Sequence, residues 1–327
     1  MHHIRTFTAT RLGFFLSRLL ILIGIVVFFT ILGIIAGQGL CKLIFRVDMA
    51  EINFLNISDL DSNQIAALKL FQTFAGSIGM FLLPALIFPN AIGRGTSYFL
   101  KTKNPNRWFN WPIAFSVIIV SVPIVSWMYH LNQGMKFPVE WSSFETQIRH
   151  MEDKANEFTK VFTQANSYGM LFLNLIVVAV IPAICEELFF RGILQNFLKM
   201  CIYNEIVAII FAAIIFSGFH GQFYGFLPRF VLGIILGFIY ANSGSIWVVI
   251  FAHFINNAMA TLMIFMVSYY PDVAILKDDY VFPMAVNILS IVMVVGLIWW
   301  QKKMYLDYMN SKIQKMSFEN LKEHQNP

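Results

Sequence analysis

The sequence predicts an all-α, polytopic membrane protein whose helices form a conical or bundled core around a polar cavity inside the membrane. Hydrophobic residues make up 58% of the 327 residues and charged residues only 13%, about half the charged share of a soluble protein. Apolar runs of about twenty residues recur along the chain, long enough to cross a hydrocarbon core roughly 30 Å thick. These runs are uninterrupted and rich in Leu, Ile, Phe and Ala, which favours helices over strands.

We expect eight membrane-spanning helices. They cover about 16–37, 66–89, 110–130, 168–200, 204–220, 227–242, 245–268 and 281–301. The fourth is too long for one straight crossing and contains Pro182, so we expect it to kink or to extend beyond the membrane. The chain then divides into an N-terminal membrane region (1–167), a core that carries the buried polar residues (168–268), and a last span with a basic tail (269–327).

Charge is distributed unevenly among the predicted loops. Basic residues dominate the N-terminus, the 91–107 loop and the tail after 301, which share one side if there are eight spans. Acidic residues outnumber basic ones in the 38–65 loop and in the 131–167 segment. The positive-inside rule therefore places both termini in the cytoplasm. Apolar residues at roughly helical spacing in 131–167 predict either an amphipathic helix on the membrane surface or a solvated helical connector.

The charge pattern argues against a nucleic-acid-binding protein, and the cysteines argue against a fold held by disulfides or by a zinc ribbon. The net charge of +5 comes from loops and termini, without the basic stripe and interleaved aromatic residues of a nucleic-acid interface. The chain has three cysteines, and none of them forms a CxxC pair. The cysteines therefore predict neither a disulfide framework nor a zinc ribbon.

The stretch AICEELFFRGIL, residues 183–194, places charges inside an apolar run. Of the 18 carboxylates in the chain, only Glu186 and Glu187 lie well inside a predicted span. A charge at the bilayer centre costs about 2.5–3.5 kcal/mol on insertion scales, so such residues are candidates for a functional site. Glu187 and Arg191 are four residues apart and can pair on one helix face, whereas Glu186 points about 100° away from that face. Glu186 is therefore the carboxylate left free for chemistry.

Later spans supply two histidines and an amide. Glu186 and His220 lie at similar distances from the turn between the fourth and fifth spans, so an antiparallel hairpin places them at similar depth. Phe216 lies one turn from His220, and His253 and Asn257 share a face of the seventh span. A carboxylate, two imidazoles and an amide can activate a water and stabilise an oxyanion, or hold Zn²⁺ and its water.

Three short motifs resemble those of one family. In chain order, EELFFR fits the pattern EExxxR, FSGFH fits FxxxH, and HFINN fits HxxxN. Over about 168–262 the chain is similar to the CPBP family, the CAAX protease and bacteriocin-processing membrane endopeptidases that are also named Abi proteins. The resemblance implies a fold with an intramembrane catalytic core and an activity that hydrolyses peptide bonds within or beside the membrane.

The resemblance also implies a role for each motif residue. Glu186 and His220 would activate the attacking water, and His253 and Asn257 would stabilise the oxyanion. Three further residues would support the site: Glu187, Arg191 and Phe216.

The cofactor and the substrate are open at this point. Glu186, His220 and His253 suit ligation of Zn²⁺ as readily as acid–base catalysis, so the sequence is compatible with a metalloendopeptidase and with a glutamate peptidase. Eukaryotic members of the family remove the last three residues of prenylated CAAX proteins. The expected partners are therefore membrane lipid and a peptide or lipidated protein.

Two other functions use residues of the same kind. A non-catalytic immunity or binding protein on the same fold has little use for all four polar groups of the site. A proton-coupled transporter also carries ionisable residues within the membrane, and transporters often show two related halves. Here the buried polar residues lie in spans four to seven, without a counterpart in spans one to three.

Overall fold

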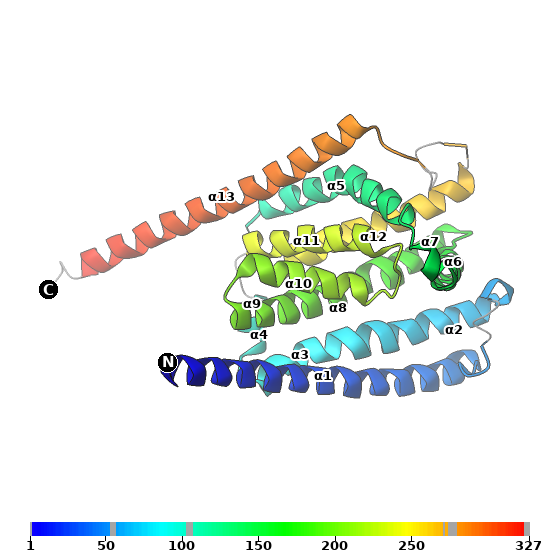
Figure 1. Cartoon of the computed structure of the whole chain (residues 1–327), viewed down its shortest axis with the longest axis horizontal. Coiled ribbons are helices and arrows are strands. Elements are labelled where there is room, and N and C mark those ends of the chain that lie inside the picture. Colours follow the sequence, from blue (N-terminus) through cyan, green and yellow to red (C-terminus); the bar gives the residue numbers. More distant parts are fainter. Residues whose placement is uncertain (1, 53–56, 103–106, 271, 274–279, 324–327) are drawn as a thin grey trace.

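The computed structural model describes residues 2–52, 57–102, 107–270, 272–273 and 280–323. Every regular element within these ranges is a helix, which confirms the predicted all-α class. The helices run back and forth between two ends of a bundle (Figure 1). In the predicted third region, residues 271, 274–279 and 324–327 lie outside the described part of the chain.

Most passages along the bundle are single helices, and two are built from consecutive segments. The single helices are α1 (His2–Phe45), α5 (Asn110–Gln133), α10 (Glu205–Gly218), α11 (Phe226–Ser243), α12 (Ile246–Tyr269) and α13 (Met284–Glu323). The first composite stretch consists of α2 (Ser62–Gln72), η2 (Thr73–Leu82) and α3 (Leu83–Ala91). The second consists of α7 (Tyr168–Asn174), η4 (Leu175–Val180), α8 (Ile181–Glu187), η5 (Leu188–Gln195) and α9 (Asn196–Ile202). The remaining elements are η1 (Ile57–Asp59), α4 (Thr96–Phe99), η3 (Val139–Trp141) and α6 (Ser142–Thr163).

The number of full-length spans differs from the prediction by one. Within the described residues, seven helical stretches are long and apolar enough to cross a membrane, and each overlaps a predicted span. The predicted fifth span corresponds to α10, which has 14 residues and is therefore about 21 Å long. This length is shorter than the hydrocarbon core. α10 is therefore a shorter apolar helix, which packs against α11 on one face and exposes Ile206 and Phe211 on another.

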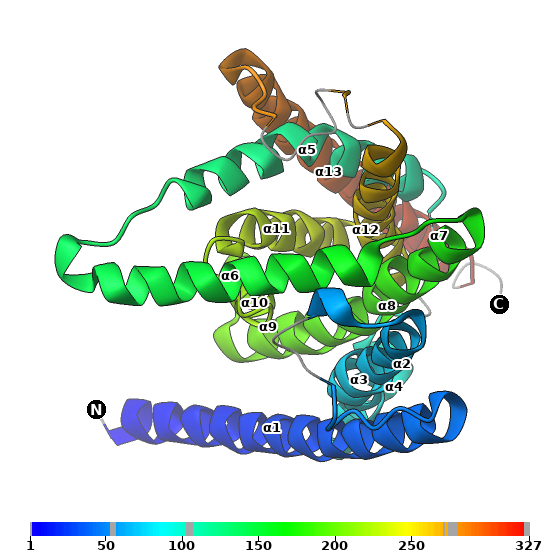
Figure 2. The same ribbon diagram turned by 90° about the vertical axis from the view of Figure 1, so that its right-hand side faces the viewer.

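The two ends of the bundle differ in what covers them. α6 lies across one end, roughly perpendicular to the other helices (Figures 1 and 2). The beginning of α1 and the end of α13 lie at the opposite end (Figure 1). Both termini thus share one end, as the charge pattern requires, and their cytoplasmic location stays a prediction.

α11 occupies the centre of the bundle and α1 its edge. In the most apolar stretch of α11, 56% of the residues are buried, against 11% in α1. Glycines bring α10 and α11 together: a Cβ added to Gly233 would lie 3.0 Å from Ala213 Cβ, and one added to Gly237 would lie 2.7 Å from Ile209 Cγ2. The close contact between these two helices therefore requires glycine at both positions.

The predicted irregularity of the fourth span takes the form of widened helical turns. η4 and η5 are π-helical, and they flank α8, which begins next to Pro182. The backbone N–H of Ile181 donates to the carbonyl of Ile176, five residues back. Proline has no N–H and cannot continue the regular i→i−4 pattern. Widened turns of this kind occur often at functional sites.

Candidate active site

The centre of the site is a buried ion pair. Arg191 Nη1 donates to Glu187 Oε1 at 2.6 Å, with side chains that are 2% and 0% exposed. Arg191 Nη2 donates to the carbonyl of Gly233 at 3.1 Å, and the guanidinium lies over the ring of Phe216, 4.7 Å from its centroid. The pair predicted from the i, i+4 spacing is present, and it joins η5 to α10 and α11.

His253 binds the same carboxylate. Its Nδ1 lies 2.6 Å from Glu187 Oε1, so Nδ1 carries the proton and donates it to the carboxylate. The other ring nitrogen, Nε2, then faces Glu186, whose Oε2 is 3.9 Å away. Glu187 therefore does more than neutralise Arg191, because it also fixes the orientation of a histidine from α12. Spacing along the chain gave no signal for this contact, since 66 residues separate the two positions.

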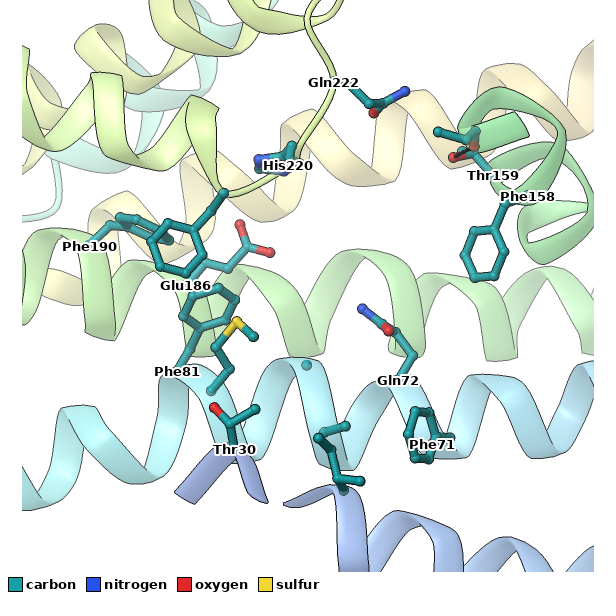
Figure 3. Close-up of a pocket in the computed structure, with 16 residues that line it drawn as sticks. Thr30, Phe71, Gln72, Phe81, Phe158, Thr159, Glu186, Phe190, His220 and Gln222 are labelled. Atoms are coloured by element: carbon teal, nitrogen blue, oxygen red, sulfur yellow. Dashed lines mark hydrogen bonds between the residues drawn. The ribbon is translucent and has the colours of Figure 1, made fainter. Parts of the chain in front are cut away.

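Glu186 points in another direction, into a cavity. Its side chain is 16% exposed, whereas that of Glu187 is 0% exposed. The cavity has a volume of about 610 Å³ and lies between α1, α2, η2, α6, α8, η5 and the loop after α10 (Figure 3). Its lining residues include Thr30, Phe71, Gln72, Phe81, Phe158, Thr159, Phe190, His220 and Gln222. Neighbouring glutamates in the sequence thus occupy opposite environments, as their helical positions predict.

His220 lines the cavity together with Glu186, as the hairpin argument predicts (Figure 3). Its Nδ1 lies 3.0 Å from the carbonyl oxygen of Phe216, so Nδ1 donates and Nε2 is left as the acceptor. The ring of Phe216 packs edge-on against both His220 and His253, with centroids 5.2 and 5.9 Å apart. Phe216 therefore contacts both histidines, and its supporting role stays a prediction.

Asn257 is placed differently from the prediction. Its Nδ2 donates to the carbonyl of Val178 at 3.4 Å, and its Oδ1 accepts from Asn256 at 3.1 Å. It does not line the described cavity that contains Glu186. Val178 lies four residues before Pro182, which cannot supply the regular backbone donor to that carbonyl. The proline was the sequence signal for this contact, and the role of Asn257 at the oxyanion stays a prediction.

The predicted metal ligands are not gathered into a metal site. Within the described ranges, no three side chains of His, Cys, Asp or Glu come close enough together to hold a metal ion. Glu186 Oε2 and His253 Nε2 are 3.9 Å apart, and the bond of His220 Nδ1 to the carbonyl of Phe216 leaves Nε2 as the nitrogen that could bind a metal. Zinc ligation by Glu186, His220 and His253 therefore stays a prediction.

α6 closes the cavity at its end of the bundle, a feature that sequence analysis missed. Glu152 of α6 is 6% exposed. It accepts from Gln222 Nε2 and from the backbone N–H of Tyr224, both at 3.1 Å. Nearly two turns further along α6, Phe158 and Thr159 line the cavity (Figure 3). The N-terminal region predicted over 1–167 therefore supplies part of the wall around the core residues.

The fold and this centre define a multi-pass helical membrane protein with a glutamate–histidine site at a cavity. Residues 168–259 match a family model described as "Type II CAAX prenyl endopeptidase Rce1-like", which confirms the family that the three motifs indicate. A curated relative is "Uncharacterized protein YpbD" of Bacillus subtilis (strain 168), 26% identical over 152 residues. The alignment covers 46% of this chain and 65% of that protein, less than two thirds of its length. No solved structure matches the chain.

Proposed function

We propose that the protein is an intramembrane endopeptidase that hydrolyses a peptide bond of a membrane-associated or lipidated peptide, with Glu186 as the general base. The observation that carries this proposal is the division between the two glutamates. Glu187 is neutralised by Arg191, whereas Glu186 faces a mostly apolar cavity beside His220. A carboxylate in that position accepts a proton from a water held between it and an imidazole.

The reaction follows from the orientation of the histidines. His220 accepts one hydrogen of the water at Nε2, while Glu186 removes the other proton. The water oxygen attacks the carbonyl carbon of the peptide and produces a tetrahedral oxyanion. The proton held by Glu186 then passes to the leaving nitrogen as the C–N bond breaks, so the base is regenerated.

His253 supplies the donor to the oxyanion in this proposal. Since Nδ1–H is directed to Glu187, the ring can donate from Nε2 only as an imidazolium. Glu186, 3.9 Å from Nε2, stabilises that cation before the reaction. Hydrogen-bond donors fixed in place before the reaction stabilise the developing charge without reorganisation.

The apolar walls of the cavity fit a substrate that enters from lipid. Phe71, Phe81, Phe158 and Phe190 surround the space in front of Glu186 (Figure 3). Walls of this kind bind apolar groups, such as a lipid chain or a hydrophobic peptide segment. The prenylated CAAX peptides processed by the family combine both features.

The test is cleavage of a quenched, farnesylated CAAX-type peptide by the purified protein in detergent. We expect cleavage by the wild type, loss of cleavage in Glu186→Gln, and retention in Glu157→Gln, a matched change on the exposed surface of α6. Cleavage by Glu186→Gln at the wild-type rate would rule out the proposed mechanism. A chelator arm tests the zinc alternative, because loss of activity on chelation and recovery with Zn²⁺ would require a metal step.

A further inference from the structure

A second cation, Arg229, contacts the cavity-lining residue Gln222 and forms no direct ion pair with the residues that the structure describes. It stands near the start of α11, half-buried, and its Nη2 donates to the side-chain oxygen of Gln222. Its Nη1 is buried and has no hydrogen-bond partner among the described residues. Among the ion pairs of the described residues, none includes Arg229. Arg191, by contrast, has Glu187 and the carbonyl of Gly233 as acceptors.

The position of Arg229 is unfavourable for folding alone. Cations are disfavoured near the N-terminus of a helix because the helix dipole is positive there. A buried donor without an acceptor is rare, and one in a native structure needs an explanation, such as a role in function. The charge acts at a distance on Glu152 and on Glu186, which places it within electrostatic range of the proposed base.

Gln222 connects this cation to the cavity. The side chain of Gln222 lines the cavity with Glu186 and His220 (Figure 3). Its amide nitrogen is held from α6 by Glu152 Oε1 at 3.1 Å and by Asn156 Oδ1 at 3.3 Å. Its oxygen is therefore a neutral acceptor for the guanidinium at the edge of the cavity. A carboxylate is a stronger acceptor for arginine, because it can take two parallel N–H bonds and compensates the charge.

We propose that Arg229 binds the C-terminal carboxylate of the peptide substrate and so selects peptides that end a few residues beyond the scissile bond. This inference rests on the proposed peptidase function and adds a residue that determines specificity. The guanidinium exchanges the neutral oxygen of Gln222 for an anion when the substrate enters. The apolar walls then hold the remainder of the substrate with its scissile bond near Glu186.

Gly225 provides a way to move the guanidinium without removing its charge. A Cβ built on Gly225 would lie 2.3 Å from Arg229 Nη1. The backbone φ of Gly225 is −100°, a value that alanine adopts without strain. In Gly225→Ala, the flexible end of the arginine must therefore shift while the fold is retained.

The experiment compares two peptides that differ only at the C-terminus, one a free acid and the other a primary amide. We expect the wild type to prefer the acid by about 10- to 100-fold in kcat/KM, the range for a hydrogen bond to a charged group. This ratio should approach one in Arg229→Gln and in Gly225→Ala, and be intermediate in Arg229→Lys, which keeps the charge but loses the planar fork. Arg149→Gln is the control, because Arg149 binds Glu145 and the carbonyl of Met135 outside the cavity.

The outcomes separate this proposal from the proposed function. Equal cleavage of acid and amide by the wild type would overturn the role of Arg229 while the peptidase function stands. A fall in both rates at an unchanged ratio in Arg229→Gln would also overturn it, since Arg229 would then act only through the charge of Glu186. Cleavage of neither peptide by the wild type would overturn the peptidase function and this inference with it.

Discussion

Two sides of one helical stretch, α8 and η5, show how adjacent residues acquire opposite roles. The packed side consists of Glu187 and Arg191 together with His253 of α12. In this group, the buried carboxylate of Glu187 binds both Arg191 and His253. The pocket side consists of Glu186 and His220, which line a cavity. On the packed side, one oxygen of Glu187 accepts from both Arg191 and His253, whereas the carboxylate on the pocket side faces the cavity and can exchange a proton. The packed side therefore supports the fold, and the pocket side is available for chemistry.

The largest effect on activity is expected on the pocket side. Glu186→Gln keeps the shape of the side chain but removes the base, so the cleavage rate should fall by about 10²- to 10⁴-fold. The melting temperature should stay at or above that of the wild type, because burying an amide in an apolar cavity costs less free energy than burying a carboxylate. Rates are measured with the quenched peptide and stability by thermal unfolding in detergent. A large drop in melting temperature would show that Glu186 belongs to the packed side.

The largest effect on stability is expected on the packed side. Arg191→Met leaves Glu187 buried without its partner, which should lower the free energy of unfolding by about 3–5 kcal/mol. The double variant Glu187→Leu with Arg191→Met removes both charges and should recover much of this loss. It should not recover activity, because His253 loses the acceptor that orients its ring. Stability equal to the wild type in the single variant would contradict the division between the two sides.

Asn257 tests where the boundary between the two sides lies. We expect Asn257→Ala to lower kcat by about 10²- to 10³-fold, the effect of removing one donor to an oxyanion. Ser268→Ala, a change at an exposed position of the same helix, is the control and should keep the wild-type kcat. If Asn257→Ala lowers only the melting temperature, its bond to Val178 is its main contribution, and Asn257 belongs to the packed side.

The smallest effect is expected at α6, far from the buried pair. The backbone N–H of Phe137 and the side chain of Arg149 hold the pKa of Glu145 below its ordinary value of 4.5. A carboxylate with a lowered pKa in the folded state stabilises the fold above the ordinary pKa, and this contribution is lost as the pH falls through the lowered value. Glu145→Gln should therefore melt slightly below the wild type at neutral pH.

The pH dependence is the check on this prediction. Melting temperatures of the two proteins should converge as the pH falls below about 4. A difference that stays constant over the whole pH range would show that packing, and not the charge of Glu145, connects α6 to the bundle. Glu157→Gln, a change at an exposed position of the same helix, controls for the loss of a surface carboxylate.

The spans could be predicted because each is a long apolar run. Composition and length alone identify such runs, and the seven long helical stretches overlap their predicted positions. α10 was the exception, since its apolar sequence resembles a span while its 14 residues are too few to be one. Turns at both ends limit the length of α10, and a hydropathy pattern does not predict where such turns lie.

Part of the site could be predicted because it depends on helical periodicity. The pairing of Glu187 with Arg191 and the separate direction of Glu186 both follow from 3.6 residues per turn. The contact between His253 and Glu187 does not, because it joins α12 to α8. Periodicity also does not predict the contact of Gln222 with Glu152 of α6. Nor does it predict the contact of Arg229 with Gln222, which lies in the loop after α10.

The sequence by itself determined the class of protein, the positions of its seven long spans, the motif residues and the local pair of Glu187 in α8 with Arg191 in η5. These properties depend on hydrophobicity and on distances of a few residues along a helix, which the order of amino acids specifies directly. Only the tertiary structure decided that one carboxylate orients a distant histidine, that α6 covers the cavity, and that Arg229 forms no direct ion pair within the described part of the chain. Each of these depends on which helix faces which, and that arrangement is set by the packing of the whole bundle.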